Sequence, residues 1–110
     1  MSVDIKSVGE LLTVMLYGEI DHHAAKDIRE KIDEAIEFNM PSLVIMDFGG
    51  VTFMDSSGIG VIMGRYRLMQ SVGGSVSAFG VSPRLDKLIE MSGIKRIVQI
   101  YTDEAAALKN

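Results

Sequence analysis

Two adjacent serines in the middle of the chain are the residues best placed to do chemistry. The run Asp55-Ser56-Ser57-Gly58 separates an apolar stretch from a segment with helical spacing, which predicts a strand-to-helix turn. The positive end of a helix meets the end of a strand there, and such a corner favours anions. A phosphate on a serine hydroxyl would accept hydrogen bonds from N–H groups of the first helical turn. The same spacing also fits a simpler role, in which Asp55 or Ser56 only caps the helix.

The residues around Ser57 do not fit a serine hydrolase. A nucleophile elbow needs glycine two positions before and two positions after the serine, but Asp55 and Ile59 occupy those positions. The two histidines, His22 and His23, lie at a different predicted helix start, and no third member of a catalytic triad is recognisable. Acyl transfer is therefore not expected, and no catalytic residue is assigned.

Three glycines that follow the serines raise the alternative of a ligand-binding turn. The dinucleotide fingerprint that begins at Gly58 and Gly60 would place its third glycine at Met63, whereas the sequence has Gly64. A structural role is preferred, in which these glycines let the helix backbone approach the sheet, at about 1 kcal/mol of helix propensity each. An enzyme that binds a small molecule through the Gly58–Gly60 turn is kept as the alternative from a different class.

The composition argues against several other classes of protein. The 110 residues include no cysteine, which rules out disulfides, thiolate nucleophiles and zinc–cysteine sites. Neither a metal nor a cofactor is expected, because adjacent helical residues such as His22 and His23 diverge and no further histidine completes a shell. The net charge of −4 opposes binding to nucleic acid or to an anionic membrane. No apolar run or leader suggests export or insertion, so a cytoplasmic protein is expected.

Apolar periodicity predicts one α/β domain over residues 1–110, with the element order ββαβαβαβα. The expected strands cover residues 3–8, 11–17, 43–48, 76–81 and 94–101. The expected helices follow Asp21, Asp55, Ser82 and Thr102. Strands that alternate with helices favour a mostly parallel mixed β-sheet joined by crossover helices. Asp21 and Asp55 both follow the carboxyl ends of strands in this scheme, so their two loops are expected to form one surface.

The chain resembles the anti-sigma factor antagonists, a family that carries the STAS fold (sulfate transporter and anti-sigma factor antagonist). The segments that carry the resemblance are residues 18–24, 53–74, 81–83 and 91–93. They extend over almost the whole chain. The Asp-Ser-Ser-Gly element alone is moderately specific, but its combination with Asp21-His22-His23 and Gly64-Arg65-Tyr66 looks like the sporulation branch, of the stage II AA type.

The resemblance implies a regulatory protein without catalytic activity. In that family the unmodified antagonist binds an anti-sigma factor, which is also an ATP-dependent serine kinase, and thereby frees the sigma factor. The kinase then phosphorylates the antagonist, and a serine phosphatase reverses the modification. The modified residue carries over to Ser57, and the partner-binding residues carry over to Asp21, Asp55, Ser56, Ser57 and Gly58. A general-stress antagonist that acts on another sigma factor is the alternative within this family.

Overall fold

The computed structural model describes residues 2–109 of the chain. Its strands are β1 (Ser2–Val8), β2 (Leu11–Ile20), β3 (Leu43–Met54), β4 (Ser75–Phe79) and β5 (Gln99–Tyr101). Its helices are α1 (His22–Asn39), α2 (Ser56–Ser71), α3 (Pro83–Ser92), the short 3₁₀ helix η1 (Ile94–Arg96) and α4 (Glu104–Lys109). Within this range the strands form one sheet in the order β1-β2-β3-β4-β5. β1 is antiparallel to β2 and the later neighbours are parallel, which confirms the expected mixed sheet.

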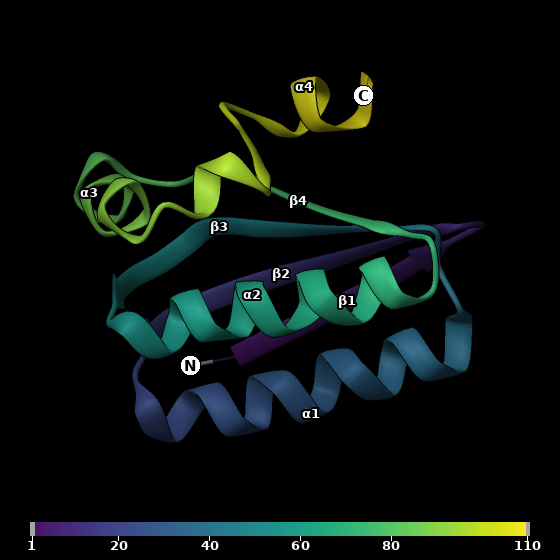
Figure 1. Cartoon of the computed structure of the whole chain (residues 1–110). Coiled ribbons are helices and arrows are strands. Elements are labelled where there is room, and N and C mark those ends of the chain that lie inside the picture. Colours follow the sequence, from purple (N-terminus) through teal and green to yellow (C-terminus); the bar gives the residue numbers. More distant parts are fainter. Residues whose placement is uncertain (1, 110) are drawn as a thin grey trace.

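Helices α1 and α2 lie side by side against one face of the sheet, and α4 lies on the opposite side (Figure 1). The larger core fills the space beneath α1 and α2. Every second residue of the first part of β2 is fully buried there, namely Leu12, Val14 and Leu16. The helical residues that face them recur at intervals of three or four positions, namely Ala25, Ile28, Ile32 and Ile36. The buried side chains of the strand, at every second residue, and of the helix, at every third or fourth residue, therefore pack together in one apolar layer.

A smaller core lies under α4. Ala107 of that helix packs with Ile45 and Phe79, which are buried residues of β3 and β4. Strands β3 and β4 are thus covered on both faces, and the apolar run at the start of β3 is typical of such a strand. No helix within residues 2–109 has the length and hydropathy needed to cross a membrane.

Capping hydrogen bonds and backbone angles of nearby residues determine where the helices begin and end. Asp21 caps α1, and its carboxylate accepts a hydrogen bond from the Ala24 N–H at 2.8 Å. Ser82 caps α3 in the same way, with Pro83 as the first helical residue. Gly93 ends α3 with φ of 77°, a left-handed conformation that glycine adopts without a Cβ penalty. Asp21 and Ser82 confirm two of the predicted caps, whereas the helix expected after Thr102 is capped by Asp103, whose carboxylate accepts from the Ala106 N–H at 2.9 Å.

The predicted strand over residues 94–101 is wrong in its first half. Ile94 and Val98 are both buried, and the Val98 N–H donates to the Ile94 carbonyl at 2.9 Å. Four residues of helical turn advance only about 6 Å, whereas four extended residues span about 13 Å, so the turn keeps both side chains within this corner of the core. The apolar run therefore forms η1 first, and β5 pairs only over its last three residues.

Strand β3 is longer than the predicted 43–48 and continues through Gly49 and Gly50 to Met54. A Cβ on Gly50 would meet the Tyr17 ring and, at 2.9 Å, the Leu16 carbonyl. The glycine thus lets β3 pass close to β2, where the register of the two strands shifts. The Gly49-Gly50 pair is typical of a strand end, but here Gly50 allows two neighbouring strands to approach each other closely.

Candidate functional site

The carboxyl ends of β2 and β3 bring two capping aspartates together. Ile20 at the end of β2 pairs with Met54 at the end of β3. The next residue, Asp55, donates its N–H to the Ile20 carbonyl at 3.2 Å. Asp21 and Asp55 are therefore on adjacent strand ends, and α1 and α2 begin at the same end of the molecule (Figure 1). The structure confirms that the two loops form one surface.

Asp55, and not Ser56, is the cap of α2. Its backbone is extended, and its carboxylate accepts from the Ser57 N–H at 2.8 Å. Its carbonyl also accepts from the Gly58 N–H at 3.0 Å. These two bonds satisfy donors of the first turn that have no partner within the helix. The backbone of both residues that follow Ser56 is therefore held in one position.

The two serines differ in their exposure. Ser56 is exposed, Ser57 is half-buried and Gly58 is buried. Within the described residues neither serine hydroxyl has a hydrogen-bond partner. Both hydroxyls are therefore free to react with an incoming group, and exposure alone does not select Ser57.

Gly58 is needed for packing, but the other two glycines of the turn and helix are not. A Cβ on Gly58 would meet the buried side chain of Met54. Positions 60 and 64 face open space instead, with no atom within 4 Å of the corresponding Cβ. The expectation that Gly58, Gly60 and Gly64 all allow a close approach to the sheet is thus confirmed for Gly58 and wrong for Gly60 and Gly64.

Asp21 is an exposed carboxylate with a stabilised negative charge. The hydrogen bond from the Ala24 N–H lowers the pKa of Asp21 below its ordinary value, and the nearby His23 contributes in the same direction. The rings of His22 and His23 meet edge to face, with centroids 6.4 Å apart. This corner of the surface presents a fixed negative charge beside two exposed imidazoles.

The surroundings of the turn give no support to the alternative of a small-molecule enzyme. The two larger hollows found on the described residues are lined by residues 31–41 together with Leu68 and Val72. None of these residues belongs to the Gly58–Gly60 turn. Residues 2–109 contain no group of three or more histidine, aspartate and glutamate side chains arranged to hold a metal ion.

An ion pair between a buried arginine of α2 and a half-exposed aspartate of α1 was not anticipated from the sequence. Arg65 of α2 is buried, with its Nε 2.9 Å from Oδ1 of Asp33 on α1. Burial lowers the pKa of Arg65, and the charge of Asp33 opposes that effect. A signal was present, because Arg65 follows Val61 and Ile62 at helical spacing and precedes Met69, and all three are buried.

Comparison with known proteins places the chain in a family. Residues 2–107 match the STAS domain, and the protein belongs to the STAS domain family. An anti-sigma F factor antagonist from Paenibacillus polymyxa is 37% identical over 108 residues, which cover 98% of this chain and 92% of the relative.

Two solved structures of the anti-sigma factor antagonist SpoIIAA share this fold. The unphosphorylated form has a TM-score of 0.83 and 34% identity, over 96% of this chain and 93% of that one. The phosphorylated form, from Bacillus, has a TM-score of 0.76 and 33% identity, over 98% of both chains. The chain is thus similar to a regulator that exists in both an unphosphorylated and a phosphorylated form.

Proposed function

We propose that this protein is an anti-sigma factor antagonist of the sporulation type, controlled by phosphorylation of Ser57. The unphosphorylated form binds an anti-sigma factor that is also a serine kinase and thereby frees the sigma factor. ATP on the kinase supplies the phosphate, and a serine phosphatase restores the active form in the cytoplasm. The observation that carries the proposal is the joint surface of Asp21 and Asp55, on which a free serine hydroxyl lies over a rigid helix start.

The choice of Ser57 over Ser56 rests on the family resemblance, and the local geometry is consistent with it. The Asp55 carboxylate holds the Ser57 N–H, which fixes the backbone of Ser57 and the direction of its Cα–Cβ bond. Gly58 is buried directly behind this residue. A kinase that binds the surface formed by Asp21, Asp55, Ser56 and Gly58 would therefore meet Ser57 in a reproducible position.

Electrostatics explain how one modification releases the partner without refolding. A phosphate adds about −1.5 to −2 charges at neutral pH. It shares the start of α2 with the Asp55 carboxylate, which already occupies the Ser57 N–H. An interface fitted to a neutral hydroxyl loses several kcal/mol when it must accept this charge, and each ~1.4 kcal/mol is a tenfold loss of affinity.

The site of modification is tested by incubating the protein with its cognate kinase and ATP and mapping the phosphate by mass spectrometry. Phosphate on Ser57 is expected. Phosphate on Ser56, with Ser57 unmodified, would overturn the assignment. In the same assay, Ser57→Ala should bind the kinase and stay bound after ATP is added, because this variant cannot receive the releasing phosphate. Ser56→Ala should be released like the parent protein.

A further inference from the structure

The other end of the α1–α2 pair contains an apolar groove. It has a volume of about 660 Å³ and lies between the last turns of the two helices. Its apolar lining comes from Ile36, Met40, Pro41, Leu68 and Val72. Fifteen residues of helix at about 1.5 Å each place Val72 roughly 22 Å from Ser57. The last turns of α1 and α2 lie at the opposite end of the molecule from the start of α2 (Figure 1), so the groove is separate from the surface around the serines.

Two apolar side chains in the groove remain in contact with water. Met40 is 82% exposed and Val72 is 66% exposed. Met40 also has φ of 48°, a left-handed conformation that costs a non-glycine residue of the order of 1 kcal/mol. Glycine would end α1 at this position without strain. The chain instead has a large apolar residue there, and Met40 lines the groove.

The charge of the groove is negative. Among residues 2–109, the charged side chains that line it are Asp33 and Glu37. Arg65 neutralises Asp33, but among the described residues Glu37 has no ion-pair partner. Both α1 and α2 end beside the groove, and neither helix has a basic residue in its last turn. The negative ends of two helix dipoles therefore add to the charge of Glu37.

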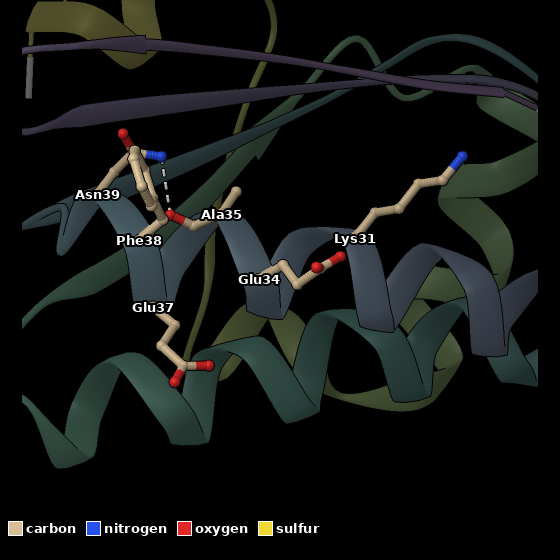
Figure 2. Close-up of a pocket in the computed structure, with 6 residues that line it drawn as sticks. All are labelled: Lys31, Glu34, Ala35, Glu37, Phe38 and Asn39. Atoms are coloured by element: carbon tan, nitrogen blue, oxygen red, sulfur yellow. Dashed lines mark hydrogen bonds between the residues drawn. The ribbon is translucent and has the colours of Figure 1, made fainter.

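The outer side of α1 provides a contrast. Figure 2 shows Glu37 pointing toward α2 and Lys31 extending away from Glu37, and Phe38 on this outer side is 88% exposed. The hollow on this side, about 760 Å³, is lined by residues of α1 alone. It has no second wall to hold a partner. Only the inner groove combines two apolar walls with an unneutralised negative charge.

We propose that the groove between the ends of α1 and α2 binds a basic amphipathic helix of another protein. Its apolar side chains would cover Met40, Leu68 and Val72, and a lysine or arginine beside them would pair with Glu37. Such a helix offers both the apolar area and the positive charge that this end of the fold leaves uncovered. Because Ser57 is at the opposite end, this contact persists whether or not Ser57 is phosphorylated.

The test uses two synthetic peptides of about 16 residues, long enough to form a bound helix. Both carry leucines at helical spacing, flanked by lysines in one peptide and by glutamates in the other. Titration into the ¹⁵N-labelled full chain, followed by NMR, should shift the signals of Ile36, Met40, Leu68 and Val72 with the lysine peptide. The glutamate peptide should bind at least about tenfold more weakly.

Three variants distinguish a specific contact from non-specific adhesion. Glu37→Gln should weaken binding of the lysine peptide at least about threefold. Met40→Gly should also weaken it without unfolding the protein, because glycine accepts the left-handed backbone. Phe38→Ala removes an equally exposed apolar side chain outside the groove and should change nothing. Ser57→Asp should leave peptide binding unchanged, so the result does not depend on the proposed switch.

Several outcomes would overturn the proposal. These are the absence of binding at about 1 mM lysine peptide, equal affinity for the two peptides, or shifts that map outside the groove. A concentration-dependent shift of the same residues without peptide would instead assign the groove to a second copy of this chain. Binding that is lost on Phe38→Ala as strongly as on Met40→Gly would likewise contradict it.

Discussion

Helices α1 and α2 begin in nearly the same way and then differ in their first turns. Asp21 and Asp55 have almost identical backbone angles, with φ of −104° and −101° and ψ of −174° and −170°. The residues that follow are His22-His23-Ala24 in α1 and Ser56-Ser57-Gly58 in α2. The Asp21 carboxylate holds the third residue of its turn, whereas the Asp55 carboxylate holds the second, Ser57. The two caps start their helices in the same way. The residues of the first turn therefore determine how the two helix starts differ chemically.

The largest expected effect comes from a negative charge placed in these first turns. Ser57→Asp should weaken binding to the cognate kinase at least about tenfold, because the charge enters the proposed interface. His23→Asp places a carboxylate at the equivalent position of α1 and should weaken binding by a smaller factor. Ser71→Asp, at the far end of α2, controls for net charge and should stay within about twofold. Isothermal calorimetry measures the affinity of each variant for the kinase, and thermal melts check that each variant is folded. Equal affinities for all three would show that the position of the charge does not matter.

A second prediction concerns Gly58, because its replacement by alanine would give α2 the same residue that α1 has at the equivalent position, Ala24. Gly58→Ala should destabilise the fold by about 1–3 kcal/mol, since the added methyl group meets the buried Met54 side chain. Gly64→Ala, on the same helix, should stabilise by about 0.5–1 kcal/mol, because its Cβ would enter open space. Urea denaturation gives both values. A stabilising Gly58→Ala would show that Met54 moves aside at little cost.

A third prediction concerns the two caps themselves. Asp21→Ala and Asp55→Ala should each lower the free energy of unfolding by about 1 kcal/mol, because each removes one carboxylate–N–H bond. The corresponding Asn variants should lose only a few tenths, since an amide oxygen still accepts that bond. Denaturant titration of the four variants tests this. A much larger loss at Asp55 would mean that this cap supports more than its own helix.

A fourth prediction separates charge from capping at α1. Asp21→Asn should lower the melting temperature at pH 7 by no more than about 2 °C but reduce affinity for the kinase by about threefold, with a weaker dependence on salt, because a charge available to an arginine or lysine is lost. Affinities at low and high salt check this result. If affinity and salt dependence both match those of the parent, Asp21 is only a cap.

The smallest effect is a dependence on pH. The pKa of Asp21 is lowered in the folded state by the Ala24 N–H, so the ionised cap stabilises the fold above the ordinary carboxyl pKa and loses this contribution as pH falls through the lowered value. The melting temperature of the parent should therefore fall relative to that of Asp21→Asn below about pH 4. A constant difference from pH 7 to acid would contradict the pKa shift.

The parts of the structure that local sequence determines were predictable. Asp21, Asp55 and Gly93 mark helix ends through bonds and dihedral angles that involve only nearby residues. Parallel strand ends also placed Asp21 beside Asp55, because that rule depends only on the order of elements. The positions of the two candidate loops therefore followed from the sequence.

Features that depend on distant segments were not predictable. Gly50 continues β3 because it passes Tyr17 of a neighbouring strand. Arg65 can be buried because its Nε lies 2.9 Å from Oδ1 of Asp33, which belongs to another helix. The groove at Met40 forms only where the ends of α1 and α2 lie next to each other. No periodicity within one segment contains this information, because it arises only when the segments pack together.

The order of the strands in the sheet has a consequence for how the protein is made. Each strand pairs with the one that precedes it in the chain, from β1 to β5, so no strand has to be inserted between two that are already paired. Contacts between segments close in sequence favour rapid folding. During synthesis, β1 and β2 can pair first, and each later helix and strand can add to the exposed edge as it leaves the ribosome. The nascent chain would thus complete the Asp21–Asp55 surface, once β3 and α2 have emerged, before the last third of the protein leaves the ribosome.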